Sequence, residues 1–234
     1  MQELERKINN KNKELKRNHV TLPSDFTYNL PCIAKSWLNN YGITKKELID
    51  NHIGWSENDT QLIYPCFDVC GNLLMYQGRK FNDGILHGNR FHTHGPCEKI
   101  YHILGDLGDG RRRIVLVEDM VSCIKVARTM PCLVLFGSTI ATERLINLSN
   151  KFTNLIIWLD KDKAKYAVAR SQIAKFMFDS VRVVITEKDP KRYTEAHFET
   201  VASALKALPP TPPPDDHIPP NVDDSSAPWN QGTQ

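Results

Sequence analysis

Residues 155–172 read LIIWLDKDKAKYAVARSQ: a short apolar run, then two aspartates, then a segment of helix length. Three other short apolar runs occur in the same half of the chain, IVLV at 114–117, CLVLF at 132–136 and VRVVI at 181–185. Segments of helix length lie between or after them, near 119–129, 141–150, 163–179 and 193–207. Short strands that are apolar throughout and alternate with helices are typical of a parallel sheet covered on both faces. The pattern therefore predicts an α/β domain in this half.

The preceding part of the chain has a different pattern. Residues 62–81 contain two apolar runs around a turn at Asp68–Asn72, which predicts a β-hairpin. Residues 33–51 predict two short helices, and the second begins at Thr44 with Glu47 three positions later, as in a capping box. We therefore expect a smaller α+β subdomain in front of the α/β domain, so that the chain is α/β in its main domain and α+β overall.

The charge of the chain is unevenly distributed. The formal total of +3 comes from 30 Lys and Arg against 27 Asp and Glu, but residues 209–234 contain no basic residue, four of the acids and 8 of the 14 prolines. Such a composition cannot bury enough apolar surface to offset its ordering entropy, so it predicts a disordered tail. The rest has 30 basic and 23 acidic residues, as expected of a nucleic-acid-binding body. The expected parts are a charged arm at 1–32, the α+β subdomain at 33–110, the α/β domain at 111–208 and the tail at 209–234.

Carboxylates follow three of the four predicted strands of the α/β domain. Glu118 comes directly after the first strand, Asp160 and Asp162 after the third, and Asp189 shortly after the fourth. Ligands of open α/β sheets bind at the carboxyl ends of the strands, and carboxylates gathered there require cations. Oxygen ligands without a nearby His or Cys favour Mg²⁺ or Mn²⁺. Any one of these acids could instead be a helix N-cap, but a Glu after one strand with an Asp-x-Asp after its neighbour favours a metal site.

This arrangement resembles the Toprim domain shared by bacterial-type primases, topoisomerases and certain nucleases. Its hallmarks, a Glu at a strand end and a later Asp-x-Asp, are matched by Glu118, Asp160 and Asp162. The preceding hairpin is similar to that of DnaG-like primases, whose motif positions are matched by Tyr64, Pro65, Asp68, Gly71, Gly78 and Arg79. Further matches are Ala164, Arg170, the KDP segment at 188–190 and the lead-in at 36–55. The resemblance covers roughly residues 33–207 and implies a Toprim-type primase core.

The sequence departs from the family pattern at several positions. Asp119 stands where a Gly usually follows the Toprim Glu, as in some phage-type primases, and Lys165 replaces a second Gly. Lys191 stands where the second acid of an Asp-Pro-Asp segment is expected, so Asp189 is the only candidate ligand there. The chain has no Cys-x-x-Cys pair, so we expect no zinc ribbon, and we expect no helicase domain after the core. We therefore expect a minimal catalytic core of a bacterial or phage-like replication protein.

The resemblance implies a two-metal nucleotidyl transfer that makes short primers on single-stranded DNA from nucleoside triphosphates. Asp160 and Asp162 would bind Mg²⁺ or Mn²⁺, and Glu118 would be either a third ligand or the proton acceptor. Five basic residues are candidates for contacts with the template or the triphosphate: Arg79, Lys80, Lys125, Lys163 and Arg170. A replicative helicase or another replication protein is the expected partner, with the acidic tail as a candidate docking segment.

Two other functions are compatible with these residues. A Toprim nuclease would use similar acids, although the primase-like hairpin argues against it. A non-catalytic replication adaptor would keep the fold and use the tail, with Trp229, to bind another protein. A topoisomerase is disfavoured because 234 residues leave no room for the strand-passage domains.

The cysteines and histidines raise the question of zinc. A possible set comprises Cys66, Cys70, His87, His92, His94 and Cys97. The two-Cys spacing is unusual for a zinc site, and the Gly- and His-rich stretch 82–96 is expected to be a loop, so we expect no zinc. The N-terminus lacks an apolar signal core and no apolar run approaches the length of a membrane span. These features predict a cytoplasmic protein with reduced cysteines.

Overall fold

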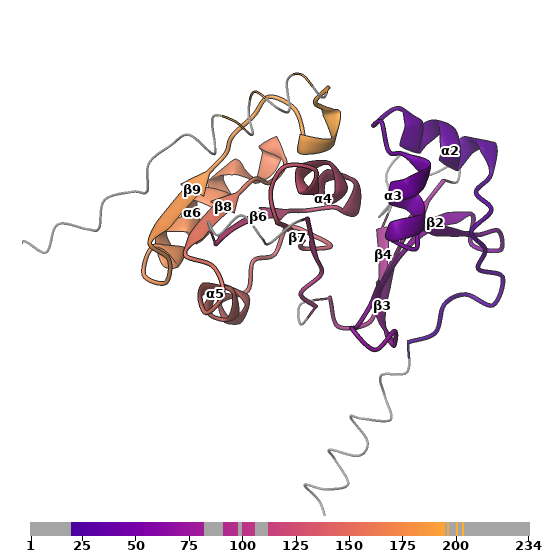
Figure 1. Cartoon of the computed structure of the whole chain (residues 1–234), viewed down its shortest axis with the longest axis horizontal. Helices are drawn as coiled ribbons and strands as arrows, with labels where there is room; N and C mark the ends of the chain where they lie inside the picture. The colour runs from indigo at the N-terminus through magenta and orange to yellow at the C-terminus, as the bar shows by residue number, and fades with distance from the viewer. Residues whose placement is uncertain are drawn as a thin grey trace, which may run out of the picture.

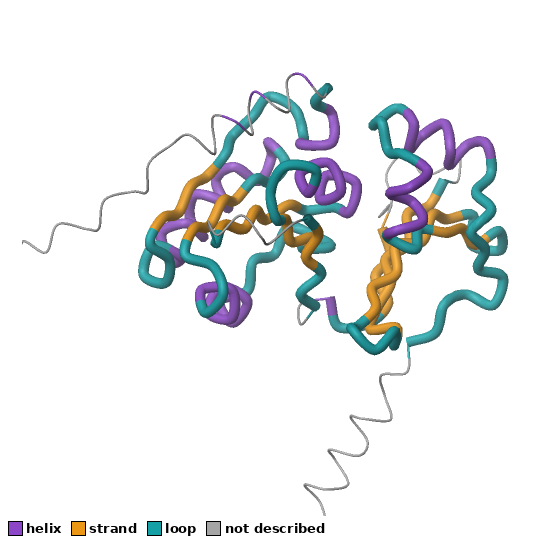
Figure 2. The backbone as a smooth tube through the Cα atoms, in the orientation of Figure 1, coloured by secondary structure: helices purple, strands orange, loops and turns teal. Residues whose placement is uncertain are grey.

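The computed structural model describes residues 20–81, 91–97, 100–105 and 112–194, with the single positions 196, 200 and 203. The expected tail, the first 19 residues of the expected arm and most of the helix expected near 193–207 lie outside the described residues. Figure 1 shows two groups of strands side by side, each accompanied by its own helices, and Figure 2 shows the same division by secondary structure. Within the described ranges, no helix is long and apolar enough to cross a membrane.

The N-terminal sheet is antiparallel, with its strands in the order β1 (Gly54–Ser56), β2 (Gln61–Phe67), β3 (Leu73–Lys80) and β4 (Phe91–His94). Strands β2 and β3 form the predicted hairpin. Its turn is closed by the Asp68 carboxylate, which accepts hydrogen bonds from the main-chain N–H groups of Cys70 (2.9 Å) and Asn72 (2.8 Å). An aspartate that satisfies the backbone of its own turn in this way makes a tight connection favourable.

Strand β4 corrects the expectation of a loop over residues 82–96. It pairs with β3 in register, with Tyr76 opposite His94 and Arg79 opposite Phe91. All four of its side chains are exposed. The segment therefore has no buried apolar face that would identify it as a strand from its sequence, and its pairing with β3 is what makes it one.

Two short helices cover the N-terminal sheet, as predicted for residues 33–51: α2 (Cys32–Asn39) and α3 (Lys45–Asp50). The capping box at the start of α3 is present. The Glu47 N–H donates to Thr44 Oγ1 (3.2 Å), and the Thr44 N–H donates to Glu47 Oε2 (2.8 Å). Ala34 and Leu38 of α2 are buried in the core beneath.

The second sheet has five strands, in the order β5 (Ile103–Leu104), β7 (Cys132–Val134), β6 (Arg113–Val117), β8 (Asn154–Ile157) and β9 (Ser180–Val183). Strands β6 to β9 are parallel, and the short edge strand β5 pairs antiparallel with β7. The intervening helices are α4 (Met120–Ala127), α5 (Thr142–Ser149) and α6 (Ala164–Ala174). The predicted α/β domain is confirmed.

Alternate residues of these strands pack into two separate cores. In β6, Val115 and Val117 belong to a core shared with α4 and with the N-terminal sheet, whereas Ile114 and Leu116 belong to a second core with α5 and α6. All four side chains are fully buried. A sheet whose two faces are both covered in this way requires continuously apolar strands, which explains the sequence pattern.

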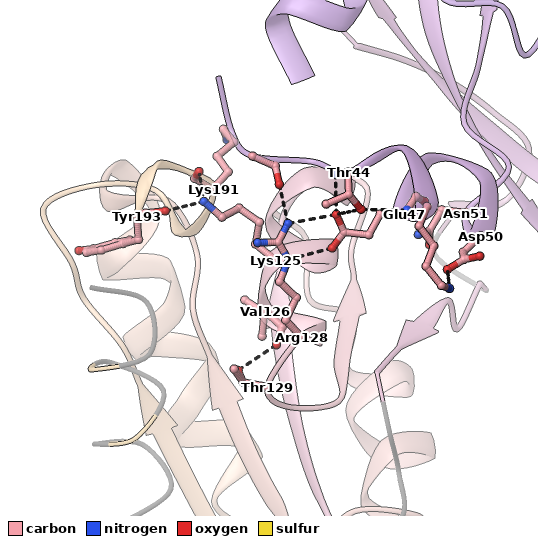
Figure 3. A network of polar contacts seen from close by, with 12 residues as sticks. Thr44, Glu47, Asp50, Asn51, Lys125, Val126, Arg128, Thr129, Lys191 and Tyr193 are labelled. Atoms are coloured by element: carbon pink, nitrogen blue, oxygen red, sulfur yellow. Dashed lines mark hydrogen bonds and ion pairs between the residues drawn. The ribbon is translucent and has the colours of Figure 1, made fainter. Parts of the chain in front are cut away.

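The two sheets are joined by polar contacts as well as by the shared core. The Arg128 guanidinium, just after α4, donates to both carboxylate oxygens of Glu47 (2.8 and 3.0 Å) and to the carbonyl of Gly42 (2.6 Å), as Figure 3 shows. The buried Gln77 amide of β3 donates to the carbonyl of Phe136 (3.1 Å), directly after β7. The Arg128 contacts join α4 to α3, and the Gln77 contact fixes the hairpin beside the carboxyl end of β7.

Candidate active site

Two of the predicted acids meet at the ends of neighbouring strands. Glu118 directly follows β6, and Asp160 follows β8 after two buried residues. The strands are parallel neighbours, so their carboxyl ends lie at the same edge of the sheet. The Asp160 N–H donates a hydrogen bond to Glu118 Oε1 (2.9 Å). The backbone after β8 therefore holds the Glu118 carboxylate in place beside Asp160.

The environment disfavours charge on both carboxyls. The pKa of Glu118 is raised to about 7, chiefly by burial and with a contribution from the charges of Asp160 and Asp162, against the opposing effect of the Asp160 N–H. Burial likewise raises the pKa of Asp160 to about 6, although the Lys191 ammonium opposes the shift and the charges of Asp189, Asp119 and Asp162 reinforce it. Carboxyls with raised pKa values that lie together at a strand edge are typical of a site that works with a bound cation.

The other two predicted acids lie on either side of this pair. Asp162 is in the 3₁₀ turn η2 (Lys161–Lys163), with its side chain 70% exposed and 3.1 Å from the Lys163 ammonium. Asp189 precedes the 3₁₀ turn η3 (Pro190–Arg192) and lies 3.3 Å from the Lys191 ammonium. Electrostatic coupling to Asp160 is present for both. All four acids thus gather at one end of the sheet.

Helix capping does not explain these acids. Asp160 and Asp189 occupy the N-cap positions of η2 and η3, but neither side chain makes a capping hydrogen bond. Asp119 is the contrasting case, because its carboxylate accepts hydrogen bonds from the Ser122 N–H (3.0 Å) and hydroxyl (2.9 Å) at the start of α4. The interpretation as N-caps therefore holds for Asp119 and is wrong for Asp160 and Asp189.

A small cleft lies where the N-terminal sheet meets the start of α4 and η3. It is lined by Trp37, Tyr64, Arg79, Phe91, Asp119, Met120 and Lys191. The Arg79 guanidinium lies over the Trp37 ring, 4.3 Å from its centroid, and 5.1 Å from that of Phe91. The buried Tyr64 hydroxyl has no hydrogen-bond partner within the described ranges. Arg79 thus places a fixed positive charge beside Asp119 and Lys191.

The remaining predicted cations are placed differently. Lys80 is half-buried at the end of β3, and Lys163 is beside Asp162. Lys125 is only 4% exposed, and its ammonium donates to the carbonyls of Lys191 (3.0 Å) and Tyr193, as Figure 3 shows. Arg170 donates to Thr142 Oγ1 (2.9 Å), which links α6 to α5. The positive groups of Lys125 and Arg170 therefore serve contacts within the chain, and their expected contacts with nucleic acid stay predictions.

The rival zinc residues are spread over different environments. Cys66 is fully buried in β2, where burial raises the pKa of its thiol, whereas Cys70 is exposed in the hairpin turn. His92 and His94 point from the exposed strand β4, and His87 lies outside the described residues. Cys66, Cys123 and Cys132 are buried free thiols, while Cys32 and Cys70 are exposed.

Several solved structures with a similar fold are primases. The Aquifex aeolicus primase, comprising its zinc-binding and RNA polymerase domains, matches with a TM-score of 0.59 at 12% identity over 75% of this chain and 55% of its own. A DnaG primase catalytic domain bound to single-stranded DNA matches with a TM-score of 0.59 at 14% identity, over 76% and 72% of the two chains. The chain has the fold of a DnaG-type primase core.

The primase fragment of the bacteriophage T7 primase-helicase protein has the same core, with a TM-score of 0.53 at 20% identity, over 80% of this chain and 81% of the fragment. This chain spans about half the length of the Aquifex primase structure. A scan against protein-family models finds no match, and a search of curated protein sequences finds none either. The primase-type core is thus recognised by its structure and by the few motif residues that resemble Toprim.

The chemistry of the acids in this primase-type core fits a hard divalent cation. Their donors are all oxygens, and Glu118 is held beside Asp160 although the charge of Asp160 raises the pKa of Glu118. The ammonium of Lys191 already stands as a cation among the acids on one side. Among the described residues, no group of three or more Asp, Glu, His or Cys side chains lies close enough together to hold a metal ion. Glu118, Asp160 and Asp162 are the residues that would close around one.

Sequence reasoning missed several residues of this region. Phe91 lines the cleft but lies in the stretch expected to be a loop, whereas Tyr64 and Trp37 match family motif positions without a predicted role in the site. From the sequence, Lys191 is interpreted as the replacement of an expected acidic ligand. In the structure its ammonium lies 2.8 Å from the carboxylate of Asp119, which is 72 positions away. The unusual acid-to-lysine exchange itself was the available signal for Lys191. Phe91 carried no comparable signal.

Proposed function

We propose that the chain is a DNA primase-like nucleotidyltransferase that makes short primers on single-stranded DNA. The observation that carries this proposal is the pairing of Glu118 and Asp160 through the Asp160 N–H, at the carboxyl ends of two parallel strands in a primase-type fold. Because a fold by itself does not establish a reaction, the argument depends on these acids and on the cations near them.

The proposed reaction joins a nucleotide to the 3′ end of a primer. The 3′-hydroxyl oxygen bonds to the α-phosphorus, the bond from that phosphorus to the bridging oxygen breaks, and pyrophosphate leaves with the electron pair. Bound Mg²⁺ or Mn²⁺ would activate the hydroxyl and stabilise the leaving oxygens. The chain must then hold the ion, place the triphosphate and receive the hydroxyl proton.

The acids and Arg79 account for these tasks. Asp160 and Asp162 would hold the ion, with Glu118 either as a third ligand or as the proton acceptor. The Glu118 pKa of about 7 suits proton transfer at neutral pH. Glu118 Oε2 is the oxygen that would accept the proton, since Oε1 accepts the Asp160 N–H. Arg79, in the cleft beside Asp119, would bind a phosphate of the triphosphate or template.

Primer synthesis by the purified chain tests the proposal. Single-stranded DNA, ribo- or deoxyribonucleoside triphosphates and Mg²⁺ or Mn²⁺ should yield short oligonucleotides. Asp160→Asn should lower the rate by about 100-fold or more, because the bound ion contributes several kcal/mol to the barrier. The matched control is Asp179→Asn, an exposed aspartate before β9 at the opposite end of the sheet, which should retain activity. Circular dichroism checks that both variants fold.

The same assay distinguishes the alternatives. Metal-dependent degradation of the template that is lost in Asp160→Asn would replace the proposal with a nuclease. Absence of synthesis and degradation with either ion would favour a non-catalytic replication adaptor.

We also propose a replicative helicase or another replication protein as partner. The T7 neighbour is a fragment of a primase-helicase protein, and the acidic segment 209–234 is a candidate docking segment. A chain truncated after Leu208 should keep primer synthesis on naked single-stranded DNA and lose binding to that partner. Unchanged partner binding would exclude the tail as the docking segment.

A further inference from the structure

The Lys191 ammonium lies among three carboxylates. Its Nζ is 2.8 Å from an oxygen of Asp119, 3.3 Å from one of Asp189 and 3.8 Å from one of Asp160. The side chain is only 14% exposed. A buried ammonium with several carboxylate partners retains its charge, because their attraction exceeds the cost of desolvation. Lys191 therefore supplies a permanent positive charge at this position.

The position of Lys191 is fixed by its backbone as well as by its charge. The Lys125 ammonium of α4 donates to the carbonyls of Lys191 and Tyr193, on either side of the end of η3 (Figure 3). The preceding loop is tied to β8, because Trp158 Nε1 donates to Thr186 Oγ1 (2.9 Å). The segment that presents Lys191 is thus anchored to the sheet at one end and to α4 at the other.

On the opposite side of the acid group, the ion pair among the described residues is that of Asp162 with the Lys163 ammonium (3.1 Å), whose side chain is 40% exposed. Within the same ranges, the carboxylates paired with Lys191 are those of Asp119, Asp160 and Asp189. A solvated lysine of this kind is displaced at little cost, since exposed ion pairs contribute at most about 1 kcal/mol. The acid group thus has one half with a built-in cation and one half without.

We propose that Lys191 takes the place of one of the two divalent ions of a two-metal site, so that this chain holds a single Mg²⁺ or Mn²⁺ between Glu118, Asp160 and Asp162. This inference rests on the proposed nucleotidyl transfer, because it concerns how the same acids are neutralised. A second ion near Asp119 and Asp189 would have to lie within a few ångströms of the ammonium, where like charges repel strongly. Asp160 faces both cations and is the acid they share.

The number of Mn²⁺ ions bound per chain tests this inference without reference to activity. Titration followed by electron paramagnetic resonance should give one bound ion for the wild-type chain and two for Lys191→Met, which keeps the aliphatic stem and removes the charge. Lys191→Arg keeps the charge and should give one. The matched control is Lys163→Met, which removes the neighbouring lysine of the other half and should also give one.

Two further variants locate the ion. Asp162→Asn should abolish the single site of the wild-type chain, whereas Asp189→Asn should leave it in place. Any of four results would overturn the inference. These are two bound ions in the wild type, one in folded Lys191→Met, two in Lys163→Met, or loss of the site in Asp189→Asn alone. If Lys191→Met does not fold, the wild-type count and the two aspartate variants still decide. A chain that makes primers but binds two ions refutes only this inference, and one that binds a single ion without making primers refutes only the proposed function.

Discussion

Replacement of Glu118 by glutamine should stabilise the metal-free protein while abolishing its proposed activity. The pKa of Glu118 is raised from its ordinary value of 4.5 to about 7, chiefly by burial. Between these two values the folded chain retains a proton that the unfolded chain has released. Stability therefore falls as the pH rises from about 4.5 to about 7, and above pH 7 the full cost of the charged carboxylate is present.

The size of the effect follows from that difference. A fully buried carboxyl with this pKa would lose about 3 kcal/mol at pH 8. Glu118 is only partly buried, so solvent screening reduces the cost to about 1–2 kcal/mol. Glutamine has nearly the same shape and its Oε1 can still accept the Asp160 N–H. Glu118→Gln should therefore raise the melting temperature in EDTA at pH 8 by about 4 °C.

Thermal unfolding at pH 8 and pH 4, with and without Mn²⁺, tests this reasoning. The gain should be present at pH 8 and absent at pH 4, and Mn²⁺ should stabilise the wild type more than the variant. Glu187→Gln is the matched control, because this glutamate is also near the acids but 84% exposed, and its substitution should change the melting temperature by less than about 1 °C. An equal or lower melting temperature for Glu118→Gln at pH 8 would refute the claim that the carboxylate is held against its electrostatic preference.

Three other substitutions probe the contacts that support the site. Arg128→Met should lower the free energy of unfolding by about 3 kcal/mol, since it leaves the half-buried Glu47 carboxylate without its bidentate partner, and a urea titration would measure it. Gln77→Leu should cost about 1–3 kcal/mol in the same measurement, because the carbonyl of Phe136 loses its donor. Gly54→Ala should lower the free energy of unfolding by at least about 2 kcal/mol, because the added Cβ would lie 2.4 Å from the Phe26 ring. For any of the three variants, a loss of unfolding free energy below about 0.5 kcal/mol would contradict the contact described for it.

The parts of the fold that could be predicted are those whose sequence pattern has a local cause. After their first residues, strands β6 and β8 are buried on both faces and are therefore continuously apolar. The capping box at Thr44 and the turn at Asp68 are formed by residues within four positions of each other. Such features follow from the chemistry of one segment and do not depend on the rest of the chain.

The parts that could not be predicted depend on distant partners. Strand β4 is polar and exposed, and it is a strand because it pairs with β3. In the site, the rule that ligands lie at the carboxyl ends of parallel strands identified Glu118 and Asp160, because topology places both there. It could not place Lys125, whose ammonium reaches carbonyls 66 and 68 positions away, nor show that Lys191 lies among the acids.

The two lysines explain how a group of repelling carboxylates can persist in the folded chain. Lys125 donates to the main-chain carbonyls of Lys191 and Tyr193, so its substitution should disturb the η3 segment. Lys191 contributes a positive charge on the side of Asp119 and Asp189, where it lowers the repulsion that Asp160 would otherwise meet. Near Glu118 and Asp162 the cation is the partly exposed Lys163 ammonium, whose charge is screened by solvent, and this difference makes their half of the site the one where a divalent ion gains most by binding.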